Sequence, residues 1–407
     1  MSKKFSGAPY PWRIACMVLA IMLLSGLITP PVHAATRYEI GISTSSSLLW
    51  MDSAAQHARL LTIKKSGASW IRIDFSWAAI QPRPDRYMWE PYDRVVQAAA
   101  AHNIKILAVL IYTPPWARMP ECRSLIPDDN EAKKCAPRNA AEFASFAGTV
   151  AARYSRHTMR GWEIWNEPNL NGYWKSVHRN RVLVDPRAYA RLANAAARQI
   201  KPHNPDAVIL TGGLAPMFEP SLSKGMRQSE YLAQLLPHLE AGLFSGIAVH
   251  PYSWPVLPTK AAPYNAFYTV DKSKDALNLR VVMKKSGWRD KEIWATEYGA
   301  STKGLRSVND LKRNERLDHV NEAAQARILQ EGIRHWYKKS NAGPMFVHSD
   351  SDQWLAQRRN EGGFGLKRSD GTPKPAYDIF RREAQKLKKS RKDKDAVRAG
   401  RLYQSRS

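Results

Sequence analysis

The sequence predicts an α/β protein that forms one (β/α)8 TIM barrel, and three observations lead to this prediction. Eight short apolar segments alternate with eight helical patterns along the chain, and such alternation is typical of a parallel sheet. Each apolar segment runs directly into a loop, as expected of a strand that is buried on both faces. The chain of 407 residues is also long enough for one barrel with enlarged loops.

The elements follow one another in strand–helix order. The expected strands are residues 38–42, 70–74, 105–112, 161–165, 208–212, 246–250, 292–296 and 344–348. The expected helices are residues 54–66, 91–102, 140–154, 186–201, 229–240, 274–286, 318–339 and 374–387. An open, doubly wound sheet is the alternative, but residues 41–44 after the first strand lack the glycine-rich turn of dinucleotide-binding proteins.

The N-terminus has the layout of a secretory signal peptide. Three basic residues precede or open an apolar run at 14–28, which is followed by two prolines and the small-residue site Val32-His33-Ala34. We expect residues 1–34 to be removed and the protein to be periplasmic or secreted. An uncleaved N-terminal anchor is the alternative, although the run is shorter than the ~20 residues that usually span a bilayer.

Cysteine usage fits an exported protein. Cys16 leaves with the leader, so the mature chain keeps Cys122 and Cys135. An even pair in an oxidising compartment favours a disulfide, with free or redox-active thiols as the alternative. A metal site is disfavoured because the pair has no nearby histidine or further cysteine.

The charge is strongly positive, at +26 for the whole chain. Residues 381–407 hold eleven basic and three acidic residues, so much of the excess lies elsewhere. Such a chain attracts polyanions, namely acidic polysaccharides, cell-surface phosphates or membrane headgroups. Nucleic acid has no supporting motif, and a merely solvated basic surface is the alternative. We expect a barrel domain at 35–387 and a disordered basic tail at 388–407, which is poor in apolar residues.

Two glutamates stand at the ends of expected strands. Glu167 follows the fourth strand and Glu297 follows the seventh, and these strands face each other across a closed ring of eight. In such barrels the chemistry lies at the carboxyl ends of the strands. A pair of carboxyl groups serves glycoside hydrolysis, in which one protonates the leaving oxygen and the other attacks the anomeric carbon. A separation of ~5–5.5 Å would give retention of configuration, and a wider one inversion.

Several motifs carry a family resemblance. GWEIWNEPN at 161–169 and IWATEYGA at 293–300 resemble the acid/base and nucleophile strand ends of clan A glycoside hydrolases. IRIDFSWAAIQP at 71–82, YTPPWA at 112–117 and DGTPKPAYDIF at 370–380 are most similar to family 39 and related bacterial exopolysaccharide hydrolases. The resemblance covers residues 38–380. It implies a retaining mechanism with no metal and no other cofactor.

The resemblance also implies roles for single residues. It makes Glu167 the general acid/base and Glu297 the nucleophile, with ordinary loop carboxylates as the alternative. Asn166 matches the residue that hydrogen-bonds the sugar 2-hydroxyl group. Arg72 matches the arginine that supports the nucleophile, and a structural ion pair is its alternative. Asp74 is expected either to cap the following segment or to touch substrate.

Other candidate residues lie outside the two strand-end motifs that contain the glutamates. His250 and Tyr252 match a polar cluster on strand six, with a buried core histidine as the alternative for His250. Residues 346–350 depart from the tryptophan that many clan members carry after strand eight. Aromatic faces stack on sugars, and the loop tryptophans expected to do so are Trp116, Trp174 and Trp354. Trp165, on strand four, is expected in the core.

The loops at 113–138 and 168–185 are long, and such loops at the catalytic face shape binding clefts. Together with the positive charge they favour an endo-acting enzyme on a long, acidic polysaccharide. The alternatives are an exo-glycosidase of the β-xylosidase type, a transglycosylase, and a catalytically silent glycan-binding protein.

Overall fold

The computed structural model describes residues 38–155, 158–221, 223–262, 265–274, 277–302, 319–353 and 362–404. The predicted signal peptide at 1–34 and Trp354 lie outside these ranges. Within them, no helix has the length and apolar character that crossing a membrane requires.

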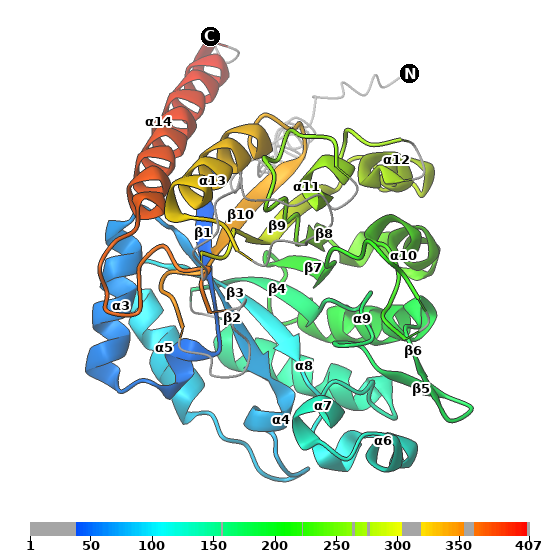
Figure 1. Ribbon diagram of the computed structural model, residues 1–407. Coiled ribbons are helices and arrows are strands. Elements are labelled where there is room, and N and C mark those ends of the chain that lie inside the picture. Colours follow the sequence, from blue (N-terminus) through cyan, green and yellow to red (C-terminus); the bar gives the residue numbers. More distant parts are fainter. Residues whose placement is uncertain are drawn as a thin grey trace, which may run out of the picture. The chain divides into compact units, whose positions relative to one another are not determined.

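A closed parallel barrel forms the centre of the molecule (Figure 1). Its order is β1-β10-β9-β8-β7-β4-β3-β2, and β2 closes the ring by pairing with β1. The strands are β1 (Ile40–Ser45), β2 (Trp70–Ser76), β3 (Lys105–Ile111), β4 (Met159–Asn166), β7 (Val208–Gly213), β8 (Gly246–Val249), β9 (Glu292–Tyr298) and β10 (Ala342–His348). The predicted (β/α)8 barrel is confirmed, and the open sheet is excluded.

Helices surround the barrel and join successive strands (Figure 1). The main ones are α3 (Ser53–Lys65), α5 (Glu90–Ala101), α8 (Ala140–Tyr154), α9 (Pro186–Ile200), α10 (Gln228–Leu235), α12 (Leu279–Lys285), α13 (Glu322–Trp336) and α14 (Pro375–Gln404). Side-chain oxygens of Asp52, Asn139, Asp185, Asn278 and Asn321 cap five of them by accepting backbone amides of the first turn. The sequence therefore marks where these helices begin.

Shorter elements decorate the loops. They are η1 (Ser47–Trp50), α4 (Trp77–Ile80), η2 (Pro115–Ala117), α6 (Pro120–Leu125), α7 (Asp129–Ala132), the hairpin of β5 (Ser176–His178) with β6 (Arg181–Leu183), η3 (Leu236–His238), η4 (Ala241–Leu243) and α11 (Ala266–Thr269).

The barrel interior changes character along the strands. An apolar cluster of buried side chains holds Trp70, Leu107, Val208, Leu210, Ala248, Trp294 and Phe346. Side chains alternate between the two faces of a strand with a period of two. Two residues beyond Trp70 on β2 the same face carries Arg72, which is 1% exposed. The apolar layer therefore supports a buried polar layer nearer the carboxyl ends of the strands.

The predicted disorder of the C-terminal segment is wrong for residues 388–404, because α14 continues through them to Gln404. Lysine, arginine, alanine and glutamine are good helix formers, so a basic segment without proline can extend a helix that already exists. Contacts also hold it, since Arg391 pairs with Glu39 and the Lys394 ammonium lies 4.6 Å from the centre of the Tyr38 ring.

The predicted disulfide is confirmed. Cys122 in α6 pairs with Cys135, at a Cα–Cα distance of 6.5 Å and a sequence separation of 13. The Thr113 hydroxyl donates to the Cys135 carbonyl at 2.6 Å, which ties the bridge to the loop that follows β3.

Removing the bridge should loosen this loop. We expect Cys122→Ala with Cys135→Ala to lower the free energy of unfolding by about 3 kcal/mol, the chain-entropy value for a loop of this length. Urea unfolding of the variant and of the wild type under the same oxidising conditions measures the difference. An unchanged unfolding midpoint would contradict a structural role for the bridge.

Candidate active site

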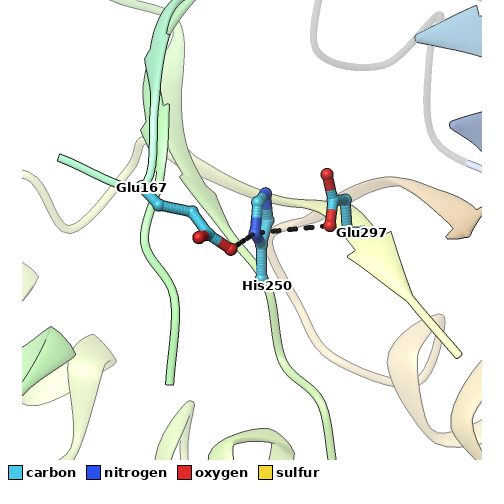
Figure 2. Close-up of side chains that lie close together, drawn as sticks. All are labelled: Glu167, His250 and Glu297. Atoms are coloured by element: carbon cyan, nitrogen blue, oxygen red, sulfur yellow. Dashed lines mark hydrogen bonds and ion pairs between the residues drawn. The ribbon is translucent and has the colours of Figure 1, made fainter. Parts of the chain in front are cut away.

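Glu167 and Glu297 face each other across His250 at the carboxyl end of the barrel (Figure 2). The Nδ1 atom of His250 lies 2.8 Å from Oε1 of Glu167 and 3.7 Å from Oε2 of Glu297. One carboxylate oxygen of each glutamate lies within 4.8 Å of the other. Retaining glycosidases hold their carboxyl groups at ~5–5.5 Å and inverting ones at ~6.5–9.5 Å. This close approach is nearer to the retaining arrangement than to the inverting one.

The end of β4 has an unusual backbone that places two polar side chains together. Trp165 and Glu167 have φ angles of 73° and 48°, in the left-handed region that non-glycine residues rarely adopt. The in–out alternation breaks there, so Asn166 and Glu167 both reach the site although they are adjacent in the sequence. Strain of this kind concentrates at functional sites.

Arg72 on β2 connects the site electrostatically. Its Nη1 donates to Oε1 of Glu297 at 2.7 Å, and its Nη2 donates to Oδ1 of Asn166 at 2.6 Å. Burial alone would lower the pKa of Arg72, but Glu163 and Glu297 raise it above its usual value. The planar guanidinium thus orients two of the sequence-predicted site residues.

Glu163 on β4 is a residue that sequence reasoning missed. It is completely buried, and its carboxylate accepts hydrogen bonds from Nε and Nη2 of Arg72 at 2.7 and 3.0 Å. It also accepts the Gly213 amide at 2.8 Å and the Thr296 hydroxyl at 3.3 Å. The sequence signal that could have identified it is the single charged residue in the expected strand 161–165. A fully buried carboxylate needs a hydrogen-bonding or charged partner. Glu163 acts through Arg72 and is a positioning residue.

The surroundings of Glu297 favour its ionised form. Burial by itself would raise the pKa of Glu297, but the charges of His250 and Arg72 outweigh it. His348 adds to this effect, and the Tyr252 hydroxyl donates to Oε2 at 2.9 Å. The pKa of Glu297 falls to about 2 as a result. Glu297 is therefore a carboxylate at neutral pH, as a nucleophile must be.

His250 is completely buried, and its Nδ1 atom lies beside both glutamates, while its role in the site stays a prediction. Burial would lower the pKa of its imidazole, but Glu297 and then Glu167 raise it above its usual value. A side chain on Gly213 would lie 2.2 Å from Nε2 of His250. Only glycine at position 213 leaves room for the ring between the two glutamates.

Asp74 does not cap the next segment, because the Ser76 side chain caps α4 by accepting the Ala79 amide. Burial raises the pKa of Asp74 to about 6, with Arg72 opposing the rise and Glu297 adding to it. Asp74 is thus a third carboxyl group near the pair.

The predicted sugar platforms fall into three different situations. Trp174 is 1% exposed and packs edge-on against Trp165 and Tyr189, so its position does not suit a platform. Trp165 lies in the core as expected. Trp116 is half-buried, and its indole donates to the Gln81 carbonyl at 3.0 Å. Trp354 lies outside the described residues. The Trp174 prediction fails because its loop folds back onto the barrel.

An aromatic cluster that was not predicted stands beside Glu297. The Phe364 ring has its centre 5.7 Å from that of Tyr252, 6.0 Å from that of Trp254 and 5.4 Å from that of His348. This cluster borders the strand end where the clan's usual tryptophan is replaced. Its sequence signals were the departure at residues 346–350 and the candidate Tyr252.

Within the described ranges, Glu167, His250 and Glu297 are also the group that could jointly hold a metal ion. Their hydrogen bond and ion-pair contacts account for the arrangement without one. That the reaction needs no cofactor stays a prediction.

The barrel and its paired carboxylates define a clan A glycoside hydrolase. A family model described as cellulase (glycosyl hydrolase family 5) matches residues 34–337, and the chain belongs to that family. The chain is 26% identical over 240 residues to the β-xylosidase of Geobacillus stearothermophilus, covering 56% of this chain and 42% of the relative. It thus spans less than half the length of that relative.

Solved structures share the fold. A family 39 glycoside hydrolase from Bacteroides cellulosilyticus WH2 aligns with a TM-score of 0.56 at 20% identity, over 86% of this chain and 64% of its own. A monomeric β-xylosidase from Caulobacter crescentus CB15 gives 0.57 at 20%, over 84% and 67%. Xylanase 10B from Thermotoga petrophila RKU-1, in complex with xylobiose, gives 0.57 at 14%, over 87% and 96%. The predicted likeness to family 39 within clan A is confirmed.

Breaking the Arg72 network should destabilise the fold. We expect Arg72→Met to lower the free energy of unfolding by about 3–5 kcal/mol, because Glu163 would remain buried without its cation. Adding Glu163→Gln should recover most of this loss. Urea unfolding of the single and double variants provides the measurement, and additive losses would argue against the coupling.

Proposed function

We propose that this chain is an exported, retaining hydrolase of O-glycosidic bonds in a polysaccharide. Glu297 attacks the anomeric carbon while Glu167 protonates the departing oxygen, which leaves a glycosyl group on Glu297. Glu167 then takes a proton from water, and the resulting attack frees Glu297 with the configuration retained. The observation that carries the proposal is the close carboxylate pair with the pKa of Glu297 held at about 2.

Neighbouring residues take supporting roles in this proposal. Arg72 and Tyr252 hold Glu297 ionised and oriented through hydrogen bonds to its two oxygens. Asn166 uses its Oδ1 atom for Arg72, so its Nδ2 donor is the group offered to the sugar 2-hydroxyl. His250 contacts both glutamates through its Nδ1 atom, and its charge helps to hold the pKa of Glu297 below the usual value.

The preferred substrate is a long polymer cleaved internally. The long loops after β3 and β4 and the formal charge of +26 support an acidic polysaccharide. Export to the periplasm or exterior rests on the leader-like residues 1–34.

A specific observation favours the exo-acting alternative, since a similar curated protein is a β-xylosidase. The positive charge of the C-terminal helix also supports contact of this helix with a cell surface or membrane.

Reducing-end release from neutral and acidic polysaccharides and xylans tests the proposal. We expect Glu297→Gln to reduce hydrolysis to background and Glu167→Gln to reduce it by about 10²–10⁴-fold. Glu240→Gln, on a surface salt bridge with Arg198, is the matched control and should retain activity. Products formed first with the substrate's anomeric configuration indicate retention. Inversion, or full activity of Glu297→Gln, contradicts the mechanism, and early monosaccharide release contradicts endo action.

The Tyr252 hydroxyl gives a separate, pH-dependent expectation. Tyr252→Phe removes a donor that stabilises the Glu297 carboxylate, so the pKa of Glu297 should rise. The acidic limb of kcat/KM should then move to higher pH, and kcat/KM at neutral pH should fall by roughly tenfold. Profiles of both enzymes on the same polymer decide this, and coincident acidic limbs would rule the effect out.

A further inference from the structure

Lys133 belongs to a loop that is fastened to the carboxyl end of β3. It follows α7 directly, and its carbonyl accepts the Thr113 amide at 2.7 Å. Thr113 follows Tyr112, which comes directly after Ile111, the last residue of β3. The disulfide between Cys122 and Cys135 closes the same loop. The backbone of Lys133 is therefore held at the catalytic face by contacts on both sides.

Tyr112 comes directly after β3, and its ring lies beside Lys133. The Lys133 ammonium is 4.8 Å from the centre of the Tyr112 ring. Burial raises the pKa of Tyr112, and the charges of Asp74 and Glu167 raise it further, so the ring is near both carboxyl groups. Lys133 in turn opposes the rise in the pKa of Asp74. The ammonium thus lies beside the residue that follows β3, at the carboxyl end of the barrel where the two glutamates lie.

This ammonium is poorly satisfied within the protein. Its one hydrogen bond, to Oδ1 of Asn130, is long at 3.4 Å, and no carboxylate of the described residues forms an ion pair with it. By contrast, Lys134 and Lys175 share Glu131 at 2.6 and 3.3 Å. Lys133 is half-buried, and burial together with Lys134 lowers its pKa, whereas the charges of Asp129, Asp74 and Glu131 oppose this shift. A partly desolvated cation that has no direct ion pair gains when a ligand supplies a carboxylate within hydrogen-bond distance.

We infer that Lys133 is a specificity-determining residue that binds the carboxylate of a uronic acid unit next to the cleaved bond, with the Tyr112 ring beside the sugar. This inference rests on the proposed function and names its substrate class. An ammonium is a compact donor that suits one carboxylate oxygen, whereas recognition of both oxygens would require an arginine. The positive charge spread over the chain would draw such a polymer to the site.

The test measures binding without turnover. The Glu297→Gln enzyme is titrated with a xylan bearing glucuronic acid units, and with the same xylan after its carboxyl groups are reduced to alcohols. We expect about tenfold tighter binding of the acidic form, the value of one charge-assisted hydrogen bond. Adding Lys133→Met should abolish the preference, and Lys133→Arg should largely restore it.

Lys284→Met is the matched control. It removes the same charge from an exposed position in the last turn of α12 and should leave the preference unchanged. Loss of preference in this control, its persistence in Lys133→Met, or equal or undetectable binding of the two polymers would overturn the inference. Circular dichroism verifies that each variant folds, and Glu167→Gln is the second background. Failure of the proposed function would be seen in a different measurement, as the absence of reducing-end release by the wild type.

Discussion

The buried guanidinium of Arg72 is the interaction on which the rest of the site depends. One planar group donates to Glu163, Glu297 and Asn166, which come from strands β4 and β9. A buried charge is costly unless it is paired and hydrogen-bonded, so each partner is needed by the others. Because the guanidinium donates its hydrogen bonds in a fixed fork geometry, it also fixes the orientation of the groups that accept them. Glu297 is thereby held by a hydrogen bond between strands.

The polar layer lies above a barrel interior that buried apolar side chains fill. Trp70 and Trp294 meet edge-on at 5.5 Å and, with Phe346, fill the interior below Arg72. A low local dielectric strengthens every charge interaction above this layer. It also explains why neighbouring carboxyl groups differ so much. Glu297, against Arg72 and His250, has a pKa of about 2, whereas burial raises the pKa of Asp74 to about 6.

Sequence periodicity was enough to locate all eight barrel strands, because a strand buried on both faces is a short apolar run with clear ends. Ends of helices were less predictable. The helix expected at 229–240 stops at Leu235, where Pro237 in the next turn lacks an amide hydrogen. The helix expected to end at residue 387 continues to Gln404, and Arg391 in the extension pairs with Glu39. Composition alone does not contain such contacts.

Site residues, like the helices and strands, were predictable where a local sequence pattern marks them and not where tertiary contacts decide. Glu167 and Glu297 were identifiable because strand ends are visible in the sequence and barrel topology brings them together. Glu163 was not, since its role requires knowing that it shares the interior with Arg72. Loop residues such as Trp174 and Lys133 depend on how each loop folds back, which no local pattern specifies. The proposed catalytic residues thus lie at strand ends, whereas the proposed specificity residue Lys133 lies in the loop that the disulfide closes.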